Sequence, residues 1–86
     1  EGIVNYALAL KGVVLAALIK EKKDGIYLSL RSVGNVPVNT WAKEYFAGGG
    51  HKNAAGGISH LSLAQTIAKF EELVKMNQHV LQAIPT

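Results

Sequence analysis

The glycine-rich stretch at residues 47–57 is the part of the sequence whose residue types are best suited to chemistry. Three consecutive glycines, Gly48 to Gly50, precede His51 and Lys52. Residues without a Cβ let a ligand approach successive backbone N–H groups, and such a concavity of amides binds phosphate. If a short helix begins near His51, its N-terminal amides would add a second favourable interaction with an anion. The alternative is a glycine-rich turn with an exposed histidine, because the stretch matches neither the Walker nor the dinucleotide-binding fingerprint.

Arg31 is the only arginine of the chain. A guanidinium can hold a phosphate through two parallel hydrogen bonds, whereas a lysine acts as a point charge. Residues 26–31 alternate, so that Leu28 and Leu30 share one face of a strand while Arg31 lies on the other. We therefore expect the guanidinium at a strand end, on the polar side of a sheet. There it either binds a phosphate or is solvated.

Few other side chains suit catalysis or metal binding. Asp24 is the sole aspartate, and the Asp-Gly pair that it opens predicts a hairpin turn, flanked by solvated lysines. A carboxylate-rich metal cage therefore cannot be built from this chain. His60 and His79 have no partner at metal-ligand spacing. Trp41 falls at helical spacing, which favours a place in the core over a base-stacking role.

Composition limits the chain to one small globular domain. The 86 residues are 49% hydrophobic and 17% charged, which excludes a disordered chain, and the formal charge is +3. Without cysteine there is no disulfide framework, so we expect a cytoplasmic location. The apolar residues 13–19 are far fewer than the roughly 20 that a membrane span needs, so we expect no membrane association. The chain opens at Glu1 rather than methionine, and we expect a fragment of a longer protein.

The elements that position the glycines and the arginine follow from hydrophobic periodicity. Residues 13–20 and 26–31 predict a β-hairpin, residues 38–46 a helix capped by Asn39 or Thr40, and residues 58–61 a further strand. Ser62 and Gln65 fit a capping box that begins a long C-terminal helix. We therefore predict an α/β layer domain in which the glycine-rich stretch is a loop and the last helix covers the sheet. The neighbours of each strand do not follow from the sequence. The apolar stripe predicted for the last helix consists of Leu63, Ile67, Phe70, Val74, Leu81 and Ile84.

The glycine-histidine motif, followed by Ala54-Ala55-Gly56, resembles the DHH-associated C-terminal domain of the DHH-type phosphoesterases. The resemblance extends over nearly all of the chain. It includes residues 1–6, Gly12-Val13, Asp24-Gly25, Leu30-Arg31-Ser32, and Val38-Asn39 with Ala42. The most similar members are the short two-domain bacterial enzymes that degrade oligoribonucleotides and dephosphorylate phosphoadenosine phosphate. Ala47 departs from the family, where a further glycine is frequent at this position.

The resemblance implies that residues 1–86 form the substrate-binding domain of a larger phosphoesterase. An N-terminal domain with an Asp-His-His motif would hold two manganese ions, and the present domain would close over the substrate. No such motif occurs here, so we expect the fragment to be catalytically inert and to hold no metal or cofactor. The expected partners are that catalytic domain, a short RNA or phosphorylated nucleotide, and a possible second copy of the protein. The substrate-binding residues that the resemblance implies are Arg31, Ser32, Gly48, Gly49, Gly50, His51, Asn53 and Ala54.

Three other functions are compatible with the same residues. Related enzymes cleave cyclic dinucleotides with a similar domain. A domain resembling this one is also appended to alanyl-tRNA synthetases, where it touches tRNA without catalysis. A purely structural or dimerisation domain is the third alternative. The histidine directly after the glycines, together with the start at residues 1–5, favours the phosphoesterase.

Overall fold

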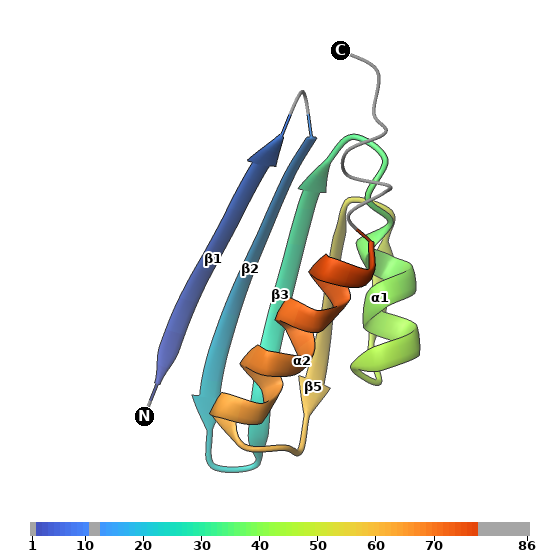
Figure 1. Cartoon of the computed structure of the whole chain (residues 1–86). Coiled ribbons are helices and arrows are strands. Elements are labelled where there is room, and N and C mark those ends of the chain that lie inside the picture. Colours follow the sequence, from blue (N-terminus) through green and yellow to red (C-terminus); the bar gives the residue numbers. More distant parts are fainter. Residues whose placement is uncertain (1, 11–12, 78–86) are drawn as a thin grey trace.

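The computed structural model describes residues 2–10 and 13–77, and in this part of the chain it shows a five-stranded antiparallel sheet with two helices. Both helices pack on the same side of the sheet (Figure 1), which leaves the other side uncovered by them. The strand order is β1-β2-β3-β5-β4, so β1 and β4 are the edges. The elements are β1 (Ile3–Leu10), β2 (Val13–Lys22), β3 (Gly25–Val33), α1 (Val38–Tyr45), β4 (Gly49–His51), β5 (Ala54–Ser59) and α2 (Leu63–Met76).

The predicted hairpin is present as β2 and β3, and the turn lies where the Asp-Gly pair predicts it. Lys22 pairs with Gly25, which has a φ of +154° that suits glycine. Asp24 accepts a hydrogen bond of 2.6 Å from the hydroxyl of Tyr27. This bond lowers the pKa of the Asp24 carboxyl below its ordinary value and raises the pKa of Tyr27. The turn therefore sets the register of both strands.

The hydrophobic core lies between the sheet and the two helices. Phe70 of α2 is fully buried and meets Tyr6 of β1 and Trp41 of α1 edge to face, with ring centroids 5.0 and 6.4 Å apart. Trp41 is thus a core residue, as predicted. The buried apolar residues on this side are Leu15, Ala17, Ile19, Ile26, Leu28, Leu30, Val36, Val38, Trp41, Ala42, Phe46, Ala55, Phe70, Leu73 and Val74.

Helix α2 is fixed to the sheet by polar contacts as well as by packing. The capping box predicted for Ser62 and Gln65 is present, with both of its hydrogen bonds formed. One turn later, the buried hydroxyls of Ser59 and Thr66 lie 2.7 Å apart and join β5 to α2. Because both hydroxyls find a partner, neither is buried at the cost of an unsatisfied polar group.

Several predicted elements need correction. The whole of β1 was not expected. The stretch predicted as a glycine-rich loop contains β4 and the first four of the six residues of β5, which begins at Ala54. Helix α1 has Pro37 at its N-cap and no side-chain cap, so neither Asn39 nor Thr40 caps it. The predicted stripe of α2 is confirmed as far as Val74, whereas Leu81 and Ile84 lie outside the described residues. Neither described helix is long and apolar enough to cross a membrane.

Candidate phosphate-binding face of the sheet

The uncovered face of the sheet carries most of the residues predicted to bind substrate, arranged in two rows across the strands. Directly paired residues of antiparallel strands point to the same side, so the register defines these rows. The first, called the Arg31 row, consists of Ala7, Ala16, Arg31, Ala54 and His51. The second, called the Ser29 row, consists of Asn5, Leu18, Ser29, Gly56 and Gly49.

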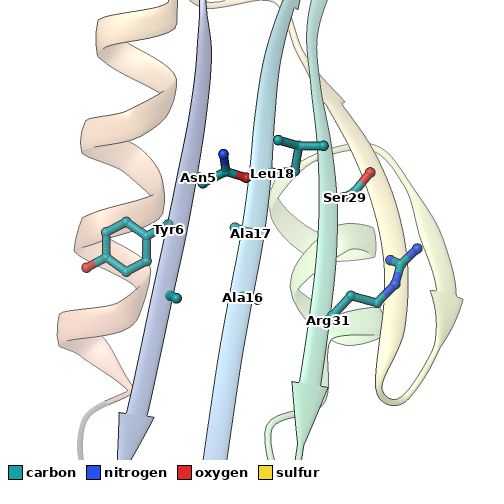
Figure 2. Close-up of a pocket in the computed structure, with 8 residues that line it drawn as sticks. Asn5, Tyr6, Ala16, Ala17, Leu18, Ser29 and Arg31 are labelled. Carbon is teal, nitrogen blue, oxygen red and sulfur yellow. The ribbon is translucent and has the colours of Figure 1, made fainter.

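Two hollows lie over these rows and meet at β3. The first, over β1 and β2, has a volume of about 410 Å³, and the second, over β5 and β4, about 260 Å³. Both are lined by Ser29 and Arg31, so they adjoin at these two residues. Figure 2 shows Asn5, Leu18 and Ser29 side by side across three strands, with the side chain of Arg31 extending toward β5. The second hollow is lined by Ser29, Arg31, Gly49, Gly50, Ala54, Ala55 and Gly56.

Backbone carbonyls hold the guanidinium of Arg31 in place. Its Nη1 donates to the carbonyl oxygen of Leu30 at 2.9 Å and lies 3.5 Å from that of Ala55. These contacts orient the side chain over β5 while Nε and Nη2 remain for other acceptors. The residue itself is exposed. Arg31 therefore presents a full positive charge to a ligand in the second hollow.

The glycines of this region fall into two groups, which differ in the reason why a residue without a Cβ is suited to the position. A Cβ on Gly48 would overlap the carbonyl oxygen of Gly56, and one on Gly50 would lie 2.6 Å from the carbonyl oxygen of Ala54. A Cβ on Gly57 would lie 2.6 Å from the Cβ of Phe46. These three glycines are needed for close packing of the backbone. A Cβ on Gly49, in contrast, would have no atom within 4 Å, so the missing side chain leaves open space beside Arg31.

His51 and Ala54 pair across β4 and β5 and extend the Arg31 row to the edge of the sheet. His51 is exposed, and its position is the last residue of a strand. The short helix considered for this position does not form, because residues 52 and 53 make the tight turn that returns the chain into β5. The amides available to an anion here are therefore those of an edge strand and not of a helix N-terminus.

Ser32 and Asn53 lie near this site but make bonds within the protein. Ser32 is buried on the helix-covered face, where its hydroxyl donates to the carbonyl oxygen of Val36 at 2.7 Å. The Asn53 amide donates to the Ser32 hydroxyl at 2.9 Å and to the carbonyl oxygen of Gly34 at 3.2 Å. The structure thus does not bring the Ser32 hydroxyl beside the Arg31 guanidinium. Both side chains join the loop after β3 to the turn between β4 and β5.

Sequence reasoning did not find the residues over β1 and β2, namely Asn5, Ala7, Ala16 and Leu18. For β1, the available signal was a weak alternation of residues 3–9, in which Val4, Tyr6 and Leu8 face the core. Among residues 2–10 and 13–77, no group of three or more histidine, aspartate or glutamate side chains could hold a metal ion.

The fold and the site define a two-layer α/β domain that exposes a cationic, glycine-lined hollow on the uncovered face of its sheet. The chain belongs to the DHHA1 domain family, whose family model matches residues 1–83. DHHA1 domains accompany an N-terminal DHH catalytic domain in DHH-family phosphoesterases, and this membership supports an accessory, substrate-binding role. Neither the curated proteins nor the solved structures contain a significant match to this chain.

Proposed function

We propose that this chain is the substrate-binding domain of a cytoplasmic, manganese-dependent phosphoesterase that acts on short oligoribonucleotides and phosphoadenosine phosphate. The observation that carries the proposal is the position of Arg31. Its guanidinium lies over the hollow that is also lined by Gly49 and Gly50, on the face that the helices leave uncovered. A guanidinium beside a backbone that carries no side chains can bind a phosphate group.

Each group at the site would have a distinct task in this function. Arg31 would bind two phosphate oxygens through Nε and Nη2. Gly49 would let the phosphate approach the backbone of β4, because no side chain stands in the way. His51, exposed at the end of the same row, would contact the nucleotide from the edge of the sheet. Ser32 and Asn53 would hold the loops in position through their own hydrogen bonds.

The proposal assigns the hydrolytic step to the DHH partner domain. Two-metal hydrolysis needs a cage of carboxylates and imidazoles, and the described residues of this chain do not fit such a cage. Manganese would therefore be held by the partner. The contribution of this domain would be to bind the substrate phosphate and orient it, which lowers the entropic cost of reaching the transition state.

The proposal is tested by titrating the isotope-labelled chain with phosphoadenosine phosphate and with a 5′-phosphorylated dinucleotide, following backbone amide shifts by NMR. We expect shifts at Arg31, Gly49, Gly50 and His51. Arg31→Gln should abolish them at ligand concentrations that saturate the wild type. The matched control is Lys43→Gln, which removes the same charge from an exposed position on α1.

Two outcomes would count against the proposal. Equal weakening by Arg31→Gln and Lys43→Gln would mean that only the net charge attracts the ligand. Shifts confined to the helix-covered side would place the site elsewhere. A cyclic dinucleotide serves as the third ligand, and stronger binding of this ligand than of phosphoadenosine phosphate would favour a cyclic-dinucleotide phosphodiesterase over an oligoribonuclease.

A further inference from the structure

We propose that the larger hollow, over β1 and β2, binds the nucleobase and ribose of the same nucleotide whose phosphate is held at Arg31. This inference rests on the proposed function, and it assigns a ligand to a surface that the phosphate site does not use. The residues concerned are Asn5, Ala7, Ala16 and Leu18, which line the hollow together with Ser29 and Arg31.

The first argument is that the two hollows adjoin. Arg31 and Ser29 line both, so a ligand bound by the guanidinium can extend over either one. Neighbouring strands of a sheet lie about 4.8 Å apart, which places Ala16 about 5 Å and Ala7 about 10 Å from Arg31 along their row. Nothing larger than a methyl group projects from the row over this distance. A flat group attached to the bound phosphate can therefore lie across β2 and β1.

The second argument is the chemistry of the surface. An exposed face of an antiparallel sheet ordinarily carries polar residues, whereas Ala7, Ala16 and Leu18 are apolar here. Leu18 is 38% exposed, so a large apolar side chain is left in contact with water. Covering it with the face of an aromatic ring would remove that contact. The hollow thus offers an apolar surface on which the face of a nucleobase can pack.

The third argument is the polar group at the far side of the hollow. Asn5 is exposed and pairs with Leu18, so its carboxamide lies across Leu18 from Ser29 (Figure 2). A carboxamide offers both a donor and an acceptor, which is the combination that the edge of a base presents in return. One positive charge at Arg31, an apolar floor, and one amide at Asn5 match a phosphate, a base face and a base edge in that order.

The test compares two ligands that share a phosphate and a ribose but differ in the base. Adenosine 5′-monophosphate and ribose 5-phosphate are titrated into the isotope-labelled chain, and dissociation constants are taken from the amide shifts. We expect the nucleotide to bind about tenfold more tightly, because its base covers the apolar side chains of Ala7, Ala16 and Leu18. Only the nucleotide should shift the amides of Asn5, Ala7 and Leu18.

Filling the hollow separates the base site from the phosphate site. Ala16→Leu should weaken the nucleotide about tenfold, to the affinity of ribose 5-phosphate, and leave ribose 5-phosphate unchanged. Ala7→Leu fills the same hollow from β1 and is the second variant if the first disturbs folding. The control is Ala68→Leu, which adds the same side chain at an exposed position on α2.

Each result decides between clear alternatives. The inference is overturned if the wild type binds both ligands equally, or if Ala16→Leu and Ala7→Leu leave the preference for the nucleotide intact. It is also overturned if both variants weaken ribose 5-phosphate as much as the nucleotide. If the wild type binds neither ligand, the proposed function itself fails. Binding of both ligands with no preference leaves the proposed function standing and removes only the base site.

Discussion

Alanine at Gly48 should destabilise the fold strongly, whereas alanine at Gly49 should leave the fold intact and weaken nucleotide binding. A Cβ on Gly48 would overlap the carbonyl oxygen of Gly56 and lie 2.7 Å from the Cα of Gly57. Both atoms belong to the backbone of β5, so they cannot rotate away as a side chain can. Either β5 or the loop before β4 must move.

The expected cost can be worked from these contacts. Overpacking of this kind costs about 1–3 kcal/mol. The shift also endangers the hydrogen bond of 2.9 Å from the amide of Gly48 to the carbonyl of Ala42, worth about 1 kcal/mol. A total of about 2–4 kcal/mol compares with a stability of about 4–13 kcal/mol for a chain of 86 residues. The melting temperature should fall by about 10–30 °C.

Gly49→Ala is the matched variant, one residue along the chain. No atom lies within 4 Å of its added methyl group, and its φ is outside the left-handed region. The loss of chain entropy in the unfolded state should make the variant about 0.4–1 kcal/mol more stable. The methyl group would nevertheless stand in the phosphate hollow, and loss of one charge-assisted hydrogen bond would weaken binding about tenfold or more.

Thermal unfolding followed by circular dichroism and NMR titration with phosphoadenosine phosphate measure the two effects separately. A Gly48→Ala protein that melts with the wild type would refute the reasoning on backbone packing. A Gly49→Ala protein that binds as tightly as the wild type would show that the phosphate does not approach β4. Loss of stability in Gly49→Ala would mean that the space beside Arg31 is not open.

Three further variants test the fold. Ala47 has a φ of +48°, so Ala47→Gly should relieve about 1–2 kcal/mol of left-handed strain. Glycine also adds entropy to the unfolded chain, so the net gain in stability should be about 0.5–1 kcal/mol, measured by urea unfolding. A lower urea midpoint than that of the wild type would contradict this. Thr66→Val removes the buried bond to Ser59 and should lower stability by about 1–3 kcal/mol in the same assay, and an unchanged midpoint would show that the bond contributes nothing. The hydrogen bond from Tyr27 lowers the pKa of Asp24 in the folded state. It therefore contributes stability at pH values above 3.8, the ordinary pKa of this group, and that stability is lost as the pH falls through the lowered pKa. Tyr27→Phe should therefore flatten the decline of the urea midpoint between pH 5 and about pH 2, and a parallel decline in both proteins would exclude this linkage.

The strands with a clear contrast between their two faces could be predicted from the sequence. In β3, Leu28 and Leu30 alternate with Ser29 and Arg31, and the structure confirms both the strand and the side on which Arg31 lies. Helix α2 could also be predicted, since a capping box and an apolar stripe are local features of the sequence. In both cases the residues that decide the structure lie close together in the sequence.

The elements that were missed depend on partners far along the chain. In strand β1, the outward-facing Ala7 and Ala9 are themselves apolar. The two faces of this strand therefore differ little in polarity, and the alternation that marks a strand is weak. Strand β4 contains two glycines, which disfavour strands on intrinsic propensity, and it forms only because β5 offers a ladder to pair with. No local signal places β5 between β3 and β4.

The residues of the candidate site also differ in how far they could be predicted from the sequence. Arg31 and the glycines were found from residue type alone, because a single arginine and a run of three glycines are unusual in so short a chain. The resemblance implied that Ser32 binds substrate, but β3 continues through Ser32, and the alternation of the strand places this side chain on the core side, opposite to Arg31. The larger hollow, over β1 and β2, could not be found without the register of three strands.

The bonds around Ser32 and Asn53 have a consequence for the rate at which a ligand would bind. They join the loop after β3 to the β4–β5 turn before any ligand arrives, as does the bond of 2.9 Å from the amide of Val38 to the carbonyl of Lys52. The loops beside the hollow therefore need no ordering step, and their entropy is already lost on folding. Encounter with the sheet would then be limited by diffusion and orientation, and differences in affinity among ligands would arise from how fast each one leaves.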